Sequence, residues 1–179
     1  MLLAAFDALA HGKSEGHTLN VVEYKEMIKK IIYKFGPFNK FIAHSFGCLA
    51  LALALEEVDH DENTRVAFIA AATEISSTID YAYKLASLND KRIRDEIDNV
   101  IYEATGNDTA WFSIKRAMHG IKAKILWVHD EDDKVTPFKD VKKVQEKNFH
   151  NIEFMITNGL GHQKIYLEKD VKDAVTKFL

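Results

Sequence analysis

Cysteine, proline and glycine are scarce, at one, two and eight of 179 residues. A single cysteine excludes a disulfide within the chain and favours a reducing, cytoplasmic location. So few prolines and glycines leave no flexible linker, and no repeat or low-complexity tract divides the chain. At this length we expect one main domain whose hydrophobic core is large enough to fold without disulfides or metals.

A charge excess of one sign is also missing, because 24 basic residues face 27 acidic ones. Nucleic-acid-binding proteins usually carry a basic excess or stripe, so we expect no nucleic-acid partner. No uninterrupted run of about 18 apolar residues occurs, so we expect no transmembrane helix and no membrane partner. Residues 1–10 are apolar but include Asp7 and lack a basic start, which argues against a signal peptide and for a strand.

Strand and helix patterns alternate along most of the chain. Apolar runs predict strands over residues 2–6, 40–44, 65–72, 123–129 and 152–157. Helical periodicity predicts helices over residues 19–35 (capped by Thr18), 46–57, 138–148 and 171–179. This alternation predicts an α/β fold, with a mostly parallel sheet and helices on both faces.

The alternation stops between residues 73 and 120. Charged and apolar residues recur there at helical spacing without a strand signal, which predicts two or three helices. We therefore expect a core formed by residues 1–72 and 121–179, with a helical insert at residues 73–120.

Three polar residues follow predicted strands closely: Ser45, Asp133 and His162. The carboxyl ends of parallel strands lie at one edge of a sheet, so we expect these side chains to meet there. A serine hydroxyl is a weak nucleophile unless an imidazole takes its proton and a carboxylate orients that imidazole. The chain order Ser, Asp, His therefore predicts a catalytic triad.

Ser45 also stands in a specific setting. The segment Ala43-His44-Ser45-Phe46-Gly47 lies between a predicted strand and a predicted helix. It fits the nucleophile elbow G-x-S-x-G with Ala as its first small residue. The N–H of Phe46 would open the helix and face a developing oxyanion, so we expect it to stabilise that charge.

These motifs resemble the α/β-hydrolase family over the whole chain. AHSFG resembles the elbow, HDEDDKVTP the loop after strand 7, GLGHQ the loop of the catalytic histidine, and FDALAHGKSEG the loop after strand 4. The loop after strand 7 commonly reads H-G-x-x-D-x-x-x-P, so Asp130 replaces the usual glycine. The resemblance implies Ser45, Asp133 and His162 as the triad, a lid at residues 73–120, and neither cofactor nor metal.

The family has eight strands, and this chain would begin at the fourth. Strands 1–3 would be absent, together with the loop that supplies a second oxyanion N–H in the family. The first strand must then close a gap of about 4.8 Å to its neighbour or pair with another chain. We expect an N-terminally truncated α/β hydrolase with an unpaired sheet edge that forms a homodimer.

Simpler interpretations exist for each residue. Ser45 could cap a helix, His162 could be an ordinary loop histidine, and Asp132 competes with Asp133 for the role of the acid. His44 is expected to pack near the site, and Cys48 to be buried. His11, His17 and the segment Asp59-His60-Asp61 lack the compact spacing of metal ligands.

We therefore hold two main hypotheses. The first is a serine hydrolase that cleaves a small carboxylic ester or thioester through an acyl-enzyme. The second is a catalytically impaired, truncated α/β hydrolase that acts as a dimeric or partner-binding domain. A weaker third keeps the enzyme but changes the bond cleaved to C–C or C–halogen, although a dehalogenase would use Asp where Ser45 stands.

Overall fold

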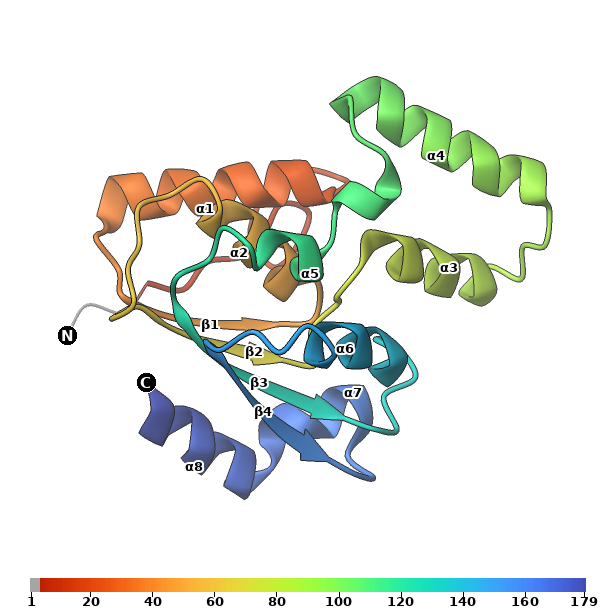
Figure 1. Ribbon diagram of the computed structural model, residues 1–179. Helices are drawn as coiled ribbons and strands as arrows, with labels where there is room; N and C mark the ends of the chain where they lie inside the picture. The colour runs from red at the N-terminus through yellow and green to blue at the C-terminus, as the bar shows by residue number, and fades with distance from the viewer. Residues whose placement is uncertain (1–3) are drawn as a thin grey trace.

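A computed structural model of the chain describes residues 4–179 and contains a four-stranded parallel sheet (Figure 1). The strands are β1 (Lys40–His44), β2 (Arg65–Ile69), β3 (Lys124–Asp130) and β4 (Ile152–Thr157), in the order β1-β2-β3-β4. The predicted α/β class with a parallel sheet is confirmed. Because all strands run the same way, the residues that follow them are gathered at one edge of the sheet.

Helices cover both faces of this sheet (Figure 1). One face carries α1 (Val21–Phe35), α2 (Phe46–Leu55), α5 (Ile114–Ala117) and α6 (Phe138–Gln145), and the other carries α7 (Gly161–Lys164), η2 (Ile165–Leu167) and α8 (Lys169–Phe178). Helix α2 is apolar on all sides, and every residue from Cys48 to Leu55 is buried. A helix that is apolar on all sides is buried in a core. The packing of α2 therefore fixes the position of its first turn.

Two predictions for the N-terminal part are wrong. Residues 4–6 have no regular structure, and the rest of the strand predicted over residues 2–6 lies outside the described residues. The segment does not close the gap to β1, so it gains no inter-strand hydrogen bonds. Helix α1 is capped by Asn20 and not by Thr18: the Glu23 N–H donates to Asn20 Oδ1 at 2.9 Å, and Glu23 Oε2 accepts from the Asn20 N–H at 3.4 Å.

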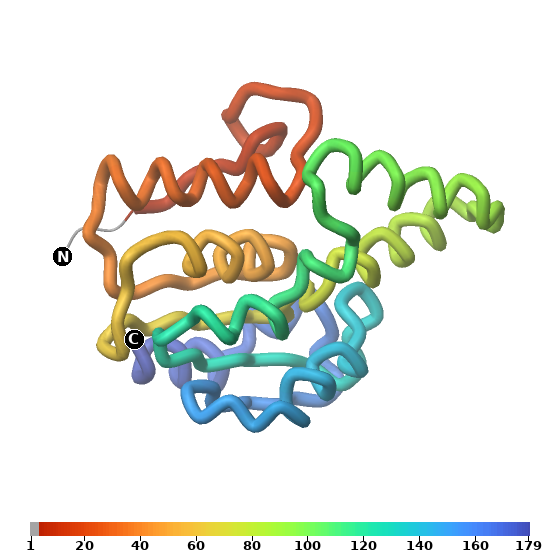
Figure 2. Tube along the Cα trace, turned by 45° about the horizontal axis from the view of Figure 1, so that its top comes forward, coloured from red at the N-terminus to blue at the C-terminus, as the bar shows by residue number. Residues whose placement is uncertain are grey.

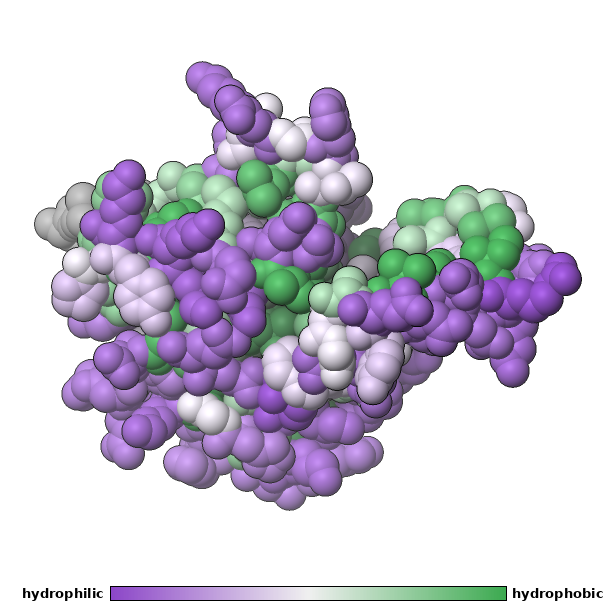
Figure 3. Space-filling model, turned by 90° about the horizontal axis from the view of Figure 1, so that it is seen from above, coloured by the Kyte–Doolittle hydropathy of each residue, from purple (hydrophilic) through white to green (hydrophobic). Residues whose placement is uncertain are grey.

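The segment between β2 and β3 is helical, as predicted. It contains α3 (Ile75–Leu85), α4 (Lys91–Thr105) and η1 (Thr109–Trp111), followed by α5. Helices α3 and α4 project from the body in both views of the chain (Figures 1 and 2). Apolar residues gather on this projection in Figure 3. Leu88, Ile93 and Val100 belong to the projecting segment and are exposed.

The last part of this segment does not project but packs into the core. Phe112, Ile114 and Ala117 are buried in the core formed with α2. The projecting part therefore ends near η1, and the domain boundaries at residues 73 and 120 stay a prediction. Within residues 4–179, no helix combines the length and the apolar character needed to cross a membrane.

Candidate active site

Ser45 occupies a sharp turn between β1 and α2. Its backbone has φ 53° and ψ −125°, a conformation that residues other than glycine rarely adopt. The turn is held by three backbone hydrogen bonds: the Ser45 N–H donates to Ile69 O at 3.0 Å, and Ser45 O accepts from the N–H groups of Cys48 and Ala72. A strained serine between a strand and a buried helix is the geometry that the elbow motif predicts.

The small residue after the turn is required by packing. A Cβ added to Gly47 would lie 3.3 Å from the hydroxyl of Tyr24 on α1. Larger side chains would push α1 away from the first turn of α2. The second small position of the motif therefore lets two helices approach each other directly beside Ser45.

The three predicted site residues meet at the carboxyl edge of the sheet. The hydroxyl of Ser45 lies 2.9 Å from His162 Nε2, and His162 Nδ1 lies 2.8 Å from Asp133 Oδ2. With the proton of the neutral ring on Nδ1, Ser45 donates to Nε2 and Nδ1–H donates to the carboxylate. The hydroxyl thus points to an imidazole that can accept its proton, and it is not used to cap α2.

Asp133 is buried and accepts hydrogen bonds from several neighbouring groups. The N–H groups of Val135 and Thr136 donate to Oδ1 at 2.8 and 2.9 Å, and the Thr136 hydroxyl donates to Oδ2 at 2.7 Å. Burial raises the pKa of Asp133, but the hydrogen bonds from His162 and Thr136 outweigh it and hold that pKa below its ordinary value. Asp133 therefore stays ionised beside the imidazole, while its competitor Asp132 accepts the Gly159 N–H at 3.1 Å.

Two more histidines surround the site without joining the triad. His129 is fully buried and its Nε2 contacts Thr136 O at 2.9 Å. His44 contacts the backbone oxygen of His162 through Nε2 at 3.2 Å, and its ring packs against the His162 ring. Burial lowers the pKa of both His129 and His44, so both are neutral near pH 7. His44 is thus a packing neighbour of the site, as expected.

These buried groups predict acid sensitivity. For His44, His129 and Asp133 the folded pKa lies below the unfolded value, so the unfolded chain binds more protons on acidification. Their stabilisation is complete above the unfolded pKa values and is lost as the pH falls, from about pH 6.5 for the histidines and about pH 3.9 for Asp133. We expect the free energy of unfolding, measured by urea denaturation, to fall in these two stages.

The variant His129→Phe provides the comparison for the first stage. It removes one of the two histidines whose pKa is lowered, so its loss of stability between pH 7 and pH 5 should be smaller than that of the wild type. A wild-type protein whose unfolding free energy stays constant over this interval would contradict the prediction.

Phe46 is the first residue of α2. Its N–H lies before the helical hydrogen-bond ladder begins, and it follows Ser45 directly, where an oxyanion donor is needed. Cys48 is fully buried two residues further on, and burial raises the pKa of its thiol far above the ordinary range. Cys48 is therefore no thiolate nucleophile.

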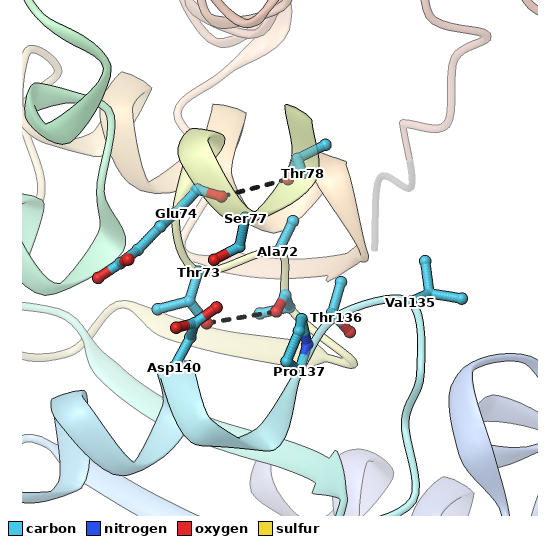
Figure 4. Close-up of a pocket in the computed structure, with 10 residues that line it drawn as sticks. Ala72, Thr73, Glu74, Ser77, Thr78, Val135, Thr136, Pro137 and Asp140 are labelled. Atoms are coloured by element: carbon cyan, nitrogen blue, oxygen red, sulfur yellow. Dashed lines mark hydrogen bonds between the residues drawn. The ribbon is translucent and has the colours of Figure 1, made fainter. Parts of the chain in front are cut away.

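A small cavity lies beside the site, between the start of α3 and the start of α6 (Figure 4). Its walls include Ala72, Thr136 and the buried Asp140, and its volume is about 10 Å³. This is room for about one water molecule, so the cavity does not hold an acyl chain. Within the described part of the chain, no cluster of three or more His, Cys, Asp or Glu residues is arranged to hold a metal ion.

Sequence reasoning missed two polar residues of the site, Thr136 and Asp130. Thr136 contacts both Asp133 and His162 Nδ1, the latter at 3.3 Å. Asp130 is fully buried and accepts hydrogen bonds from the segment that leads to His162. The signal for Thr136 was its place three residues after an aspartate in a turn, where Asp side chains often accept local hydrogen bonds.

Comparison with known proteins gives one kind of match. No protein-family model and no curated protein sequence matches the chain. An esterase from Pyrococcus furiosus superposes with a TM-score of 0.67 at 22% identity, over 98% of this chain and 68% of the esterase. A monoacylglycerol lipase from Paleococcus ferrophilus gives 0.63 at 19% identity, over 97% and 79%.

A third solved structure, mouse alpha/beta hydrolase domain-containing protein 10, gives a TM-score of 0.62 at 16% identity, over 96% of this chain and 73% of its own. All three cover nearly the whole of this chain but leave part of their own length unmatched. Identities this low carry information on architecture, and the architecture agrees throughout. The chain therefore has the α/β-hydrolase fold.

Proposed function

We propose that this protein is a serine hydrolase that cleaves small carboxylic esters or thioesters through an acyl-enzyme. The observation that carries the proposal is the unbroken chain of contacts from the Ser45 hydroxyl through both nitrogens of His162 to Asp133, at 2.9 and 2.8 Å. Both distances lie within the range expected for a nucleophile, its base and the group that orients the base.

The reaction follows from these contacts. Ser45 Oγ attacks the carbonyl carbon while His162 Nε2 takes the hydroxyl proton, and Asp133 stabilises the imidazolium that forms. The Phe46 N–H donates to the oxyanion. The tetrahedral intermediate collapses to the acyl-enzyme as His162 returns the proton to the leaving alcohol or thiol. Water, deprotonated by His162, then attacks the ester carbonyl carbon. The bond to Ser45 Oγ breaks, His162 returns the proton to this oxygen, and the carboxylic acid leaves.

Two further observations support a hydrolase of esters. The matched proteins from Pyrococcus furiosus and Paleococcus ferrophilus are named as an esterase and a monoacylglycerol lipase. The strained backbone of Ser45, which costs about 1–3 kcal/mol, is the geometry of a nucleophile elbow. The projecting helices α3 and α4, within the segment at residues 73–120, would serve as the lid over the substrate.

Labelling of the active serine tests the proposal. A fluorophosphonate phosphorylates a serine only when a neighbouring base activates it, so we expect an adduct on the peptide that contains Ser45. Peptide mass spectrometry locates the adduct, and His162→Ala should abolish it. A wild-type protein that is folded by circular dichroism but resists the reagent would overturn the proposal and favour the non-catalytic alternative.

We also propose that two copies associate through β1. This strand lies at the edge of the described sheet, and the Ile42 side chain is 61% exposed on it. Exposed edges of this kind pair readily with another chain. Light scattering should give twice the 20.4 kDa of one chain, and Ile42→Lys should shift the protein towards the monomer. A wild-type monomer at micromolar concentration would refute the dimer.

A further inference from the structure

Asp130 is a buried carboxylate with no role in the proposed reaction. It ends β3 and is 0% exposed. Charged groups are rarely buried unless other groups compensate them. None of the ion pairs among residues 4–179 includes Asp130, so its charge is compensated by hydrogen bonds alone.

The donors to Asp130 come from two separate segments. Its Oδ1 accepts the Asp132 N–H at 3.0 Å, from the turn that carries Asp133. Its Oδ2 accepts the Thr157 hydroxyl at 2.7 Å and the Leu160 N–H at 3.1 Å, from the segment between β4 and His162. One carboxylate therefore joins the turn of the acid to the loop of the base.

Besides Asp130, the loop is held by Asp132, which accepts the Gly159 N–H at 3.1 Å, and by His44, which contacts the His162 backbone oxygen at 3.2 Å. Gly159 and Gly161 have φ of +81° and +62°, and a side chain at either position would meet no atom within 4 Å. Helix α7, which carries His162, has four residues and no side-chain cap among the described residues. The contacts of Asp130 thus reach Leu160, two residues before His162.

We infer that Asp130 is a positioning residue: by joining the two segments, its carboxylate sets the contact between His162 Nδ1 and Asp133 Oδ2. The expected effect on kcat rests on the proposed function. The contact between His162 and Asp133 does not depend on any substrate. Displacement of a catalytic group by about 1 Å can cost about 10²-fold in rate. A positioning residue should therefore affect kcat and leave substrate binding nearly unchanged.

The kinetic test compares three variants in the hydrolysis of p-nitrophenyl acetate. Asp130→Ala removes every acceptor, and we expect kcat to fall by about 10²-fold while KM changes less than about threefold. Asp130→Asn keeps the shape and one acceptor oxygen, so it should recover part of the loss. The matched control is Asp61→Ala, which removes hydrogen bonds to the N–H groups of Asn63 and Thr64 at the opposite end of the sheet and should leave kcat unchanged.

Proton NMR provides a readout that needs no activity. The proton on His162 Nδ1 in its hydrogen bond to Asp133 should give a resonance far downfield, identified by its loss in His162→Ala. In Asp130→Asn, and in Asp130→Ala where that variant folds, we expect this resonance to shift or broaden while the remaining spectrum stays folded. An unchanged resonance, or an unchanged kcat in a folded Asp130 variant, would overturn the inference. If the wild type shows the resonance but neither labels nor hydrolyses esters, the proposed function fails and the positioning role is still decided by NMR.

Discussion

The variant Ser45→Ala is expected to lower kcat for a short-chain p-nitrophenyl ester by at least about 10⁴-fold, and His162→Ala by a similar factor. Without the hydroxyl no acyl-enzyme forms, and without the imidazole the hydroxyl keeps its proton. Because both residues act in one step, the double variant should be no slower than either single one. Initial rates at saturating substrate give kcat directly.

A similar loss of activity is expected when Asp133, the acid of the triad, is changed. Asp133→Asn keeps the size of the side chain but presents an amide where His162 Nδ1–H donates at 2.8 Å. The ring then turns its protonated nitrogen towards Ser45, and kcat should fall by about 10⁴-fold although the site stays assembled.

The control for these variants is Ser87→Gly. Ser87 is exposed on the projecting segment, and its φ of 54° suits glycine. It should hydrolyse the ester at the wild-type rate. A Ser45→Ala protein that retains more than a tenth of the wild-type kcat, or single losses that multiply in the double variant, would show that Ser45 and His162 do not work as one unit.

The sequence predicts all four strands, and its bounds for the edge strands β1 and β4 agree with the structure, because apolar runs stand out from the polar loops. It misjudges the end of β2. The strand predicted over residues 65–72 stops at Ile69, since Ala70 has φ 47° and the chain bends until the Ala72 N–H reaches Ser45 O. This bend is needed to hold the elbow, which belongs to another strand. Local apolar character carries no information about such a contact.

The same contrast between local sequence patterns and long-range contacts explains which site residues could be predicted. Ser45, Asp133 and His162 could be predicted to meet, because parallel strands place the residues that follow them at one edge. The contacts of Thr136 and Asp130 depend on how two loops fold against each other. The segment at residues 2–6 shows that apolar character alone does not make a strand. No neighbouring strand pairs with its described part.

The core beneath the site is organised by a row of residues across the sheet. In register, Ala43 of β1 pairs with Phe68 of β2, Phe68 with Trp127 of β3, and Trp127 with Phe154 of β4. The Trp127 ring lies 5.5 Å from the Phe68 ring and 5.8 Å from the Phe154 ring. The row ends two residues before Ser45, so the same packing that stabilises the sheet supports the elbow.

Trp127→Ala is therefore expected to reduce the free energy of unfolding by about 3–5 kcal/mol, a large part of the 5–15 kcal/mol typical of a whole domain. The side chain is fully buried, and its removal leaves a cavity between two aromatic rings that cannot collapse across a hydrogen-bonded sheet. Trp127→Phe is the matched control. It keeps the aromatic contacts and removes an indole N–H that is buried without an acceptor among the described residues, so it should cost less than about 2 kcal/mol. Urea denaturation measures both values; equal losses in the two variants would contradict the prediction that the filled volume at this position stabilises the sheet.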